Sequence, residues 1–599
     1  MKSRFSPIIL AVLILSLALQ TIALPVYAQS EPNLSQAEME SLVIPQKREQ
    51  PSYPDHREAQ LYTEDLFESG ERPDAIPPSP EIIAKTQEQV KAFYCSSVTD
   101  VPQLECDILE LLYQYTNGAG WTNNTNWLQS TMVSTWYGVT VKMGRVTTID
   151  LSENQLSGTI PMALSNLSNL EALLLGGNQL IGGIPADLGY LSNLVALDLS
   201  NNLLPGSIPS TLGNLSNLKT LHLFHNQLDG TIPSALGNLS NLQELYLFNN
   251  QLTGSIPSDL SNLSNLEYLF LGHNQLTGNI PAVLGYLSNL KVLHLFENQL
   301  TGVIPAALGN LSKLEVLYLF ENQLTGSIPS TLGNLSNLGY LSLYNNELTG
   351  SIPSTLGNLS NLKSLYLDKN QLTESIPATL GSLSNLQNLN LSENHLTGTI
   401  PTTFGNLTNL KTLILNWNQL TGSIPATLGE LSNLKNLDLS WNQLKGSIPA
   451  TLGKLSNLEN LSLSENQLTG SIPTELGNLS NLQRMYIFNN QLTGNIPATL
   501  GNLSKLQSLF LFSNNLTGSI PSNLGNLSEL EYFYLNNNLL AGSIPLSFVK
   551  LTKLTYFNYS YTMLCEPTTA EFLAWKNTVD TWVGTGTICK QVCLPLIFR

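Results

Sequence analysis

The feature that most constrains this chain is an asparagine that recurs every 24 residues. The series runs without insertion or deletion from Asn154 to Asn538 and contains 17 asparagines. A proline follows each of them seven residues later, from Pro161 to Pro545. Self-similarity at a fixed period of roughly 20 to 50 residues is typical of a solenoid, in which each unit contacts its neighbours. The sequence therefore predicts stacked repeats and not one closed core.

The repeated unit reads L-x-x-L-x-L-x-x-N-x-L-x-G-x-I-P-x-x-L-G-x-L-S-N. In the copy around Asn322, Leu317 and Leu319 alternate with Tyr318, which is the period of a strand with one apolar face. One unit cannot bury its leucines alone, so stacked units must share a core. We expect the asparagine side chain to bond the backbone of its own turn and of the next. Glu374 replaces the usual glycine four residues after the asparagine, which predicts local strain or a different backbone.

This pattern resembles the leucine-rich repeat family, and within it the plant-type class of 24-residue repeats with L-x-G-x-I-P. The resemblance implies an α/β repeat fold. It is a curved solenoid with a parallel β-sheet on its concave face, short helical or extended segments on its convex face, and a cap at each end. We therefore expect an N-terminal cap at residues 91–145, about 17–18 repeats at residues 146–563, and a C-terminal cap and tail at residues 564–599.

The N-terminal segment has the features of a secretory signal peptide over residues 1–28. Lys2 and Arg4 precede a short apolar run, and Val26-Tyr27-Ala28 is a small-residue cleavage pattern. An uncleaved membrane anchor is the alternative. Residues 29–90 are polar and rich in proline, which favours a disordered linker, with a pro-segment as the alternative. We expect a secreted or cell-surface protein with no membrane span after signal cleavage.

Residues 106–115 have the apolar spacing of a helix, and Trp136 to Val139 match the W-x-G-V motif of N-terminal caps in extracellular leucine-rich repeat proteins. Plant receptors usually place cysteines around this motif, whereas Ser134 and Thr140 stand here. This departure favours a bacterial-type secreted or surface protein. Residues 570–583 are expected to form a helix of the C-terminal cap.

The five cysteines all lie outside the repeats. We expect disulfides Cys95–Cys106 and Cys565–Cys589, in keeping with secretion. Cys593 is left over, in a short apolar tail that either packs on the cap or acts as a sorting tag. The Asn-Leu-Ser triplets match the N-glycosylation acceptor, but they also belong to the repeat itself, so their modification stays open.

The concave face of such a solenoid presents the residues four, two and one before each asparagine. Aromatic residues occupy many of these positions, and they either form an exposed binding surface or simply pack side by side along the sheet. A polar window interrupts them at Asn388, Asn390, Ser392, Asn416, Asp438, Ser440 and Ser462. The predicted ligand-binding residues are His222, Phe224, Tyr246, Phe248, Phe270, His294, Phe296, Tyr318, Phe320, Tyr344, Tyr366, Trp417, Trp441, Tyr486, Phe488, Phe510 and Phe512.

Several chemistries are disfavoured by the sequence. The formal net charge of −17 argues against nucleic-acid partners and against docking on anionic lipid. The histidines of the concave face are spread along the repeats, so we expect no metal site and no cofactor. Glu297 and Glu321 hold the same position in adjacent repeats, but two carboxylates without a pocket do not make a glycosidase. We therefore expect no enzymatic activity.

The sequence predicts a non-catalytic extracellular recognition or adhesion scaffold that binds a protein, peptide or polysaccharide on its concave face. One alternative is a receptor-like or enzyme-inhibitor protein that resembles plant extracellular leucine-rich repeat proteins. The other is a structural surface-layer or ice-binding protein, because Thr-Gly-Ser runs such as Thr253–Ser255, Thr325–Ser327 and Thr349–Ser351 form a regular hydroxyl array. A repeat scaffold does not by itself name its ligand.

Overall fold

A computed structural model describes residues 77–589 of the chain. The predicted signal peptide, residues 29–76 of the predicted linker, and Cys593 with the apolar tail lie outside the described residues. Those expectations therefore stay predictions.

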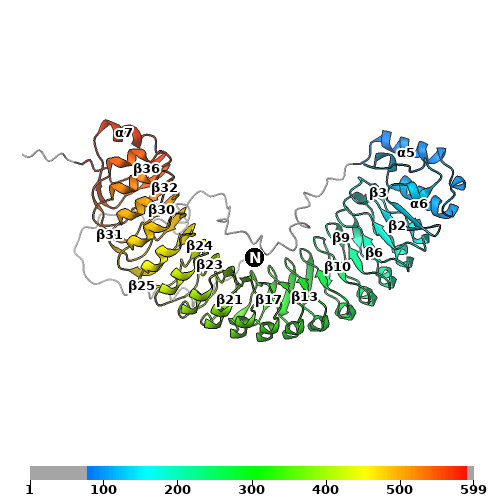
Figure 1. Ribbon diagram of the computed structural model, residues 1–599, viewed down its shortest axis with the longest axis horizontal. Coiled ribbons are helices and arrows are strands. Elements are labelled where there is room, and N and C mark those ends of the chain that lie inside the picture. The colour runs from blue at the N-terminus through cyan, green and yellow to red at the C-terminus, as the bar shows by residue number, and fades with distance from the viewer. Residues whose placement is uncertain (1–76, 590–599) are drawn as a thin grey trace, which may run out of the picture. The chain divides into compact units, whose positions relative to one another are not determined.

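The main element is a sheet of 20 strands, counted within residues 77–589, which lines the inner side of the curved repeat array in Figure 1. Consecutive repeats pair in parallel, and Leu293 lies beside Leu317 one repeat later. The first pair, β1 with β2, is antiparallel. Most strands have three residues, and the middle one is buried. The strands are β1 (Val139–Lys142), β2 (Arg145–Asp150), β4 (Ala172–Leu174), β6 (Ala196–Asp198), β8 (Thr220–His222), β10 (Glu244–Tyr246), β12 (Tyr268–Phe270), β14 (Val292–His294), β16 (Val316–Tyr318), β18 (Tyr340–Ser342), β20 (Ser364–Tyr366), β22 (Asn388–Asn390), β23 (Thr412–Ile414), β24 (Asn436–Asp438), β26 (Asn460–Ser462), β28 (Arg484–Tyr486), β30 (Ser508–Phe510), β32 (Tyr532–Tyr534), β34 (Tyr556–Asn558) and β36 (Thr581–Val583).

The return path of most repeats runs through a second short strand and then a 3-10 helix, whereas the repeats of β22 and β23 have only isolated bridges in place of that strand. The second strands pair with a different register, so that Ser255 lies beside Thr277. The 3-10 helices follow the repeated proline, from η4 (Met162–Asn166) to η20 (Leu546–Lys550). The second strands are β3 (Ser157–Thr159), β5 (Gln179–Ile181), β7 (Pro205–Ser207), β9 (Gln227–Asp229), β11 (Thr253–Ser255), β13 (Gln275–Asn279), β15 (Gln299–Val303), β17 (Gln323–Thr325), β19 (Thr349–Ser351), β21 (Gln371–Thr373), β25 (Lys445–Ser447), β27 (Gln467–Thr469), β29 (Thr493–Asn495), β31 (Asn515–Thr517), β33 (Ala541–Ser543) and β35 (Met563–Cys565).

The repeated leucines and isoleucines form one continuous core along the array. In the unit around Asn322, Leu317, Leu319 and Leu332 are fully buried. Burial of a leucine side chain contributes about 1.5–3 kcal/mol, and each layer supplies the apolar wall on which the next one packs. The predicted leucine-rich repeat solenoid, with a parallel sheet and stacked repeats, is confirmed.

The repeated asparagine ties each turn to the turn before it. Asn322 Nδ2 donates to the carbonyl of Leu295 at 3.0 Å and to Leu319 and Phe320 of its own turn, both at 3.2 Å. Its Oδ1 accepts from the backbone N–H of Leu300 at 3.0 Å. The expectation of a bond to the backbone of the following turn is therefore corrected, because the bonded neighbour is the preceding turn. One asparagine side chain thus bonds backbone groups in the bend of its own turn and in the bend of the preceding turn.

Glu374 adopts the backbone of the glycine that it replaces. Its φ is +64°, close to the +75° of Gly350 and the +74° of Gly398 in the neighbouring repeats. The left-handed region places the Cβ of an L-residue close to the backbone and costs about 1–2 kcal/mol. Of the two alternatives predicted for Glu374, the structure therefore shows local strain and not a different backbone conformation.

Glu374→Gly is expected to stabilise the protein by about 1 kcal/mol, because relief of the strain exceeds the added chain entropy of a glycine. Urea unfolding measures the change. Glu347→Gly is the control, since Glu347 is exposed and is not among the residues with positive φ. It should destabilise the protein by about 0.5–1 kcal/mol. An equal effect of both substitutions would contradict the prediction.

The N-terminal cap begins earlier than expected. Helix α5 (Pro80–Ala92) lies in the segment predicted as linker up to residue 90, but it packs on α6 (Gln103–Tyr115). The Tyr113 hydroxyl donates to Gln89 at 2.7 Å, and the backbone N–H of Ala119 donates to Thr86 at 3.2 Å. The linker assignment is therefore wrong for residues 80–90. An amphipathic helix that finds an apolar surface becomes ordered, and a polar composition alone does not reveal that surface.

The helix predicted from residue 106 is confirmed as α6, and the predicted disulfide Cys95–Cys106 is present. Trp121, Trp127 and Trp136 are buried beside α6, and their rings contact one another at centroid distances of 4.8 and 4.9 Å. The tryptophans and the helix shield the first layer of the core from water. A terminal unit of a repeat protein needs such a cover.

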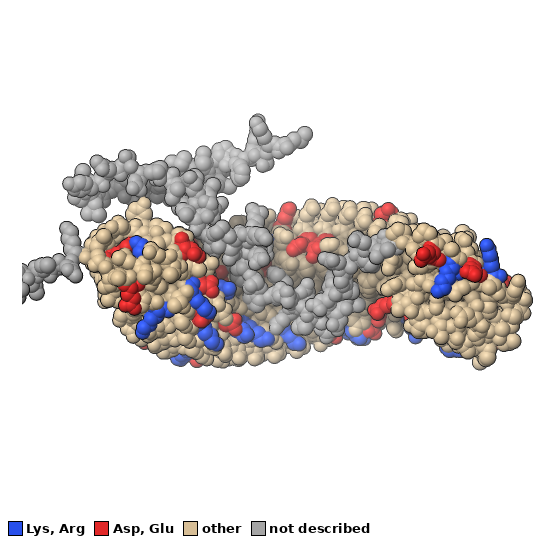
Figure 2. All heavy atoms as spheres, turned by 90° about the horizontal axis from the view of Figure 1, so that it is seen from above, with Lys and Arg blue, Asp and Glu red and all other residues tan. Residues whose placement is uncertain are grey.

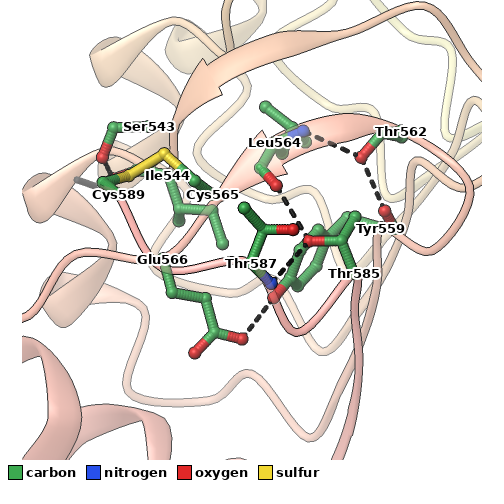
Figure 3. The surroundings of a disulfide bond; sticks show 10 residues. All are labelled: Ser543, Ile544, Tyr559, Thr562, Leu564, Cys565, Glu566, Thr585, Thr587 and Cys589. Atoms are coloured by element: carbon green, nitrogen blue, oxygen red, sulfur yellow. Dashed lines mark hydrogen bonds between the residues drawn. A yellow bond between two sulfur atoms is a disulfide. The ribbon is translucent and has the colours of Figure 1, made fainter.

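The C-terminal cap differs from the expected single helix at residues 570–583. Helix α7 (Ala570–Lys576) ends early, and β36 pairs in parallel with β34 as the last strand of the large sheet. The β-branched and aromatic residues Thr581, Trp582 and Val583 favour a strand, and pairing covers an otherwise open sheet edge. Figure 3 shows the second predicted disulfide, Cys565–Cys589, which is present beside Glu566 and Thr587.

The carboxylate of Glu566 holds this cap together. It accepts hydrogen bonds from Tyr559 and Lys576, and from Trp582 Nε1 at 2.9 Å. Burial raises the pKa of Glu566. The hydrogen bonds from Lys576, Tyr559 and Trp582 together lower this pKa by more than burial raises it, so the pKa lies below the ordinary value. The ionised form is thus favoured in the folded cap.

A lowered pKa in the folded state gives stability that is present above the unfolded-state pKa and is lost as pH falls through the folded-state pKa. Glu566→Gln should therefore destabilise the protein by about 1–3 kcal/mol at pH 7. The difference from the native protein should shrink toward pH 3. Urea unfolding at both pH values tests this. Exposed Glu571→Gln serves as the control and should change neither curve, and a difference that is constant with pH would contradict the assignment.

Candidate functional site

Four columns of side chains run along the concave face. The first and third residues of each strand share this face, because the middle residue is buried. In β24 these residues are Asn436 and Asp438, on either side of the buried Leu437. Two more columns follow, formed in this repeat by Ser440 and Trp441. Asn388 is the one first strand residue among those named from the sequence, although the two-residue alternation of a strand places all of these residues on the concave face.

The aromatic residues of the first half pack as stacks of rings. His222, Tyr246, Phe270, His294 and Tyr318 form one column with centroid distances of 4.3, 4.5, 4.4 and 4.6 Å between successive rings. The rings are nearly parallel, at interplanar angles of 6° to 14°. A spacing of one strand brings their faces into contact, so side-by-side packing of cross-strand rings stabilises the sheet here.

The predicted exposed aromatic stripe is therefore wrong for about half of its members. Two of the predicted residues, Trp417 and Trp441, are exposed. Six are partly buried, namely His222, Phe320, Tyr344, Tyr486, Phe488 and Phe512. Nine are buried, namely Phe224, Tyr246, Phe248, Phe270, His294, Phe296, Tyr318, Tyr366 and Phe510.

The histidines and acidic residues of this face are also engaged. His222 Nε2 lies 2.8 Å from Glu244 Oε2, and this hydrogen bond lowers the pKa of Glu244. His273 pairs with Glu297, and the Tyr344 hydroxyl lies 3.3 Å from Glu321. Each carboxylate of the Glu297 and Glu321 pair thus bonds a different neighbour.

The buried His294 has its pKa lowered to about 3 by burial, so it is neutral at pH 7. A neutral ring packs between its aromatic neighbours without the cost of a buried charge.

In the structure the polar window is wider than the seven residues named from the sequence: it runs from Ser364 of β20 and Asp368 through β22, β23 and β24 to β26 and the residues that follow them. Side-chain bonds link successive repeats there. Asn388 Nδ2 donates to Ser364 Oγ at 3.2 Å, and Arg484 Nη1 donates to Asn460 Oδ1 at 3.0 Å. Amide side chains both donate and accept, so they suit a partner with the same alternation of donors and acceptors.

Three buried polar atoms of the window have no hydrogen-bond partner among residues 77–589: Asp368 Oδ1, Thr412 Oγ1 and Asn416 Oδ1. Burial raises the pKa of Asp368 to about 7, so this carboxyl is partly protonated near neutral pH. An unpaired buried polar group costs about 1–3 kcal/mol. Buried atoms of the same kind also occur outside the window, at His294 Nε2, Ser342 Oγ and Asn536 Oδ1, so they do not by themselves mark a ligand site.

Trp417 and Trp441 stand directly beside the window. Their rings stack at a centroid distance of 4.2 Å and an angle of 7°, and they remain 51% and 41% exposed. Both residues have φ near +53°, as does the residue before the asparagine in the other repeats. Asparagine or glycine adopts this conformation at lower cost than a bulky side chain. Backbone fit therefore does not explain two tryptophans here, and because the same φ recurs along the array, the conformation belongs to the repeat and does not mark a functional position.

Comparison with known proteins decides the family. A model described as a leucine-rich repeat region matches residues 250–397, 314–469 and 375–519, and a single leucine-rich repeat model matches 145–167, 193–215 and 217–239. Among solved structures, the plant peptide hormone receptor RGFR1 in complex with RGF2 is 33% identical, with 75% of this chain and 83% of that chain covered and a TM-score of 0.69. The chain belongs to the leucine-rich repeat family.

Two further leucine-rich repeat structures are similar. The Arabidopsis receptor kinase HAESA, in complex with the peptide hormone IDA and the co-receptor SERK1, is 30% identical, with 81% of this chain and 86% of that chain covered and a TM-score of 0.61. The ectodomain of the Arabidopsis thaliana receptor kinase GASSHO1/SCHENGEN3, in complex with CASPARIAN STRIP INTEGRITY FACTOR 2, is 35% identical, with 82% and 65% covered and a TM-score of 0.51. The comparison with curated proteins gave no match.

The leucine-rich repeat array described here shares its architecture with receptor ectodomains. Its two disulfides lie in the caps at either end of the repeats. Over residues 77–589, no helix has both the length and the apolar composition that a membrane span requires.

Proposed function

We propose that this leucine-rich repeat protein is a non-catalytic extracellular recognition scaffold, secreted or held at the cell surface, whose concave face binds an extended peptide or a peptide segment of a protein. The observation that carries the proposal is the pair of exposed, stacked tryptophans next to a polar window. Tryptophans at such positions are frequent binding hot spots, and a peptide backbone offers donors and acceptors that match the amide and hydroxyl side chains of the window.

Two relatives support a peptide ligand, since RGFR1 is named a plant peptide hormone receptor and HAESA is in complex with a peptide hormone. The two cap disulfides support an extracellular location. The W-x-G-V motif without nearby cysteines supports a bacterial-type protein over a plant receptor. The aromatic rings that are half-buried, such as Tyr344 and Phe488, are proposed as the outer parts of the same binding face.

The test is selection of a displayed random dodecapeptide library on the protein, followed by titration of the best peptides. Ser462→Arg places a large charged side chain in the window and should weaken binding at least about 10-fold, the size of a strong contact. Ser447→Arg is the matched control, because Ser447 lies in the same array but is exposed on the second sheet.

Saturable binding that Ser462→Arg removes and Ser447→Arg leaves intact would support a concave peptide site. Equal loss in both variants, or the absence of any saturable peptide binding, would refute it. A polysaccharide that binds in place of peptides would also refute it.

A further inference from the structure

The column that contains the two tryptophans has a simple charge pattern. Glu393 holds the same position one repeat before Trp417, and Glu465 holds it one repeat after Trp441. Backbone hydrogen bonds between successive repeats continue through this column. The N–H of Trp417 donates to the carbonyl of Ser440 at 3.2 Å, and the N–H of Trp441 donates to the carbonyl of Ser464 at 3.0 Å. Neighbouring positions are therefore about one strand spacing, ~4.8 Å, apart. Two carboxylates bracket two stacked indoles.

The orientation of the indoles matters for what they can bind. They cover each other on their inner faces, at an angle of 7°. The outer face of Trp417 is therefore turned along the column toward Glu393, and that of Trp441 toward Glu465. The face of an aromatic ring carries negative potential and attracts a cation. Glu393 and Glu465 stand one repeat beyond these outer faces, so an indole face and a carboxylate in the next repeat favour the same positively charged partner.

The two carboxylates are available for such a partner. Glu393 is exposed, and Glu465 is partly buried and accepts a hydrogen bond from Asn489. Within the described residues, neither glutamate forms an ion pair. Burial raises the pKa of Glu465, which fits a carboxylate that lacks a compensating cation. Lys369 holds the same position one repeat before Glu393, on the side away from the tryptophans, and is the nearest cation of this column.

The protein as a whole would also favour a cationic ligand. Its formal net charge is −17, and in Figure 2 most of the visible surface carries neither acidic nor basic side chains. Charge-specific recognition is therefore limited to few places. The Glu393–Trp417–Trp441–Glu465 column is one at which aromatic faces and acidic groups coincide.

We propose that Trp417 and Trp441, with Glu393 and Glu465, form an anchor site for an arginine or lysine side chain of the bound extended peptide. This inference rests on the proposed function, because it identifies the chemistry of the peptide at the same site. The cation lies over an outer indole face and pairs with the adjacent glutamate. The peptide backbone crosses the polar window, where the partly buried Asn390 and Ser462 present amide and hydroxyl groups.

A neutral sugar fits this column less well. Its ring could pack on an outer indole face, but it would bring no charge to balance two carboxylates that its binding partly desolvates. Burial of an unpaired charge is costly, whereas a guanidinium or ammonium compensates that cost. The arrangement therefore favours a basic peptide over a polysaccharide.

The experiment uses the dodecapeptide with the highest affinity from the displayed library and a synthetic analogue in which each arginine becomes citrulline and each lysine becomes acetyl-lysine. Citrulline keeps the shape of arginine without its charge, and acetylation removes the charge of lysine. We expect the selected peptides to be enriched in arginine or lysine. The neutral analogue should bind at least about 10-fold more weakly, because removal of one partner of a charge pair in an interface lowers affinity by that factor or more.

Three variants locate the effect. Glu393→Gln combined with Glu465→Gln should weaken the parent peptide about 10–100-fold and leave the neutral analogue unchanged. Trp417→Asn should also weaken the parent peptide, and asparagine suits the left-handed backbone, so the fold is kept. Glu475→Gln is the control, because Glu475 is exposed on η17 (Thr474–Asn478) on the other side of the array. Thermal melting confirms that each variant is folded.

The outcomes separate the two proposals. If the selected peptides bind the window but carry no basic residue, or if the neutral analogue binds equally well, the cation anchor is wrong and the peptide-binding function stands. If peptides require a basic residue but the glutamine variants bind normally, the anchor lies elsewhere and the inference is also wrong. If no peptide binds saturably, both proposals fail.

Discussion

Asn322→Ala is expected to lower the free energy of unfolding by about 4 kcal/mol, the largest effect of any single substitution considered for this protein. The side chain of Asn322 makes four hydrogen bonds to backbone groups of two consecutive turns. Alanine leaves the N–H of Leu300 without its partner, and the carbonyl of Leu295 keeps only its bond from Asn298 Nδ2, at 3.2 Å. Each unpaired buried group costs about 1–3 kcal/mol.

The loss should also change how the protein unfolds. A repeat array is stabilised by interfaces between neighbours, so a weak interface in the middle divides it into two parts that unfold separately. Urea unfolding of Asn322→Ala should therefore show a broader transition than the native protein. Asn334→Ala is the control, because Asn334 ends η11 (Ser330–Asn334) on the exposed side of the same turn. A loss of less than about 1 kcal/mol in Asn322→Ala would contradict the structural role of the asparagine.

Glu105→Ala is expected to cost about 3 kcal/mol and to loosen the N-terminal cap. Glu105 is 1% exposed at the start of α6. One of its oxygens accepts from the backbone N–H of Val146 at 2.8 Å, and the other pairs with Arg145. These bonds tie the cap helix to β2, the first parallel strand of the sheet. Alanine leaves the buried N–H of Val146 unpaired, while the partly exposed Arg145 can turn to water.

Hydrogen exchange of the cap measures this effect directly. Amides of α6 and β2 should exchange faster in Glu105→Ala, whereas amides near the C-terminal end of the array should be unchanged, because stability in a repeat protein is local. The exposed Glu88 on α5 supplies the control Glu88→Ala. Uniform faster exchange along the whole array would show that Glu105 acts on the fold as a whole and not on the cap.

The sequence determined the repeat fold almost completely. A motif that recurs without insertion specifies the same strand, bend and 3-10 helix in every unit, because each unit meets the same neighbours. The leucines of the core, the asparagine at the bend and both disulfides could all be named from the sequence. The cap boundaries could not, because α5 and β36 are ordered by surfaces that distant residues such as Tyr113 and Phe557 provide.

The candidate site was determined by the tertiary structure. Residue types at the concave positions were readable, but their exposure was not, because it depends on the neighbours one repeat away. Tyr246 between His222 and Phe270 is covered by rings on both sides, whereas Trp417 and Trp441 protrude at the edge of a polar window. Periodicity fixes which face a side chain occupies. Only the packed array decides whether that side chain is covered by the protein or left for a ligand.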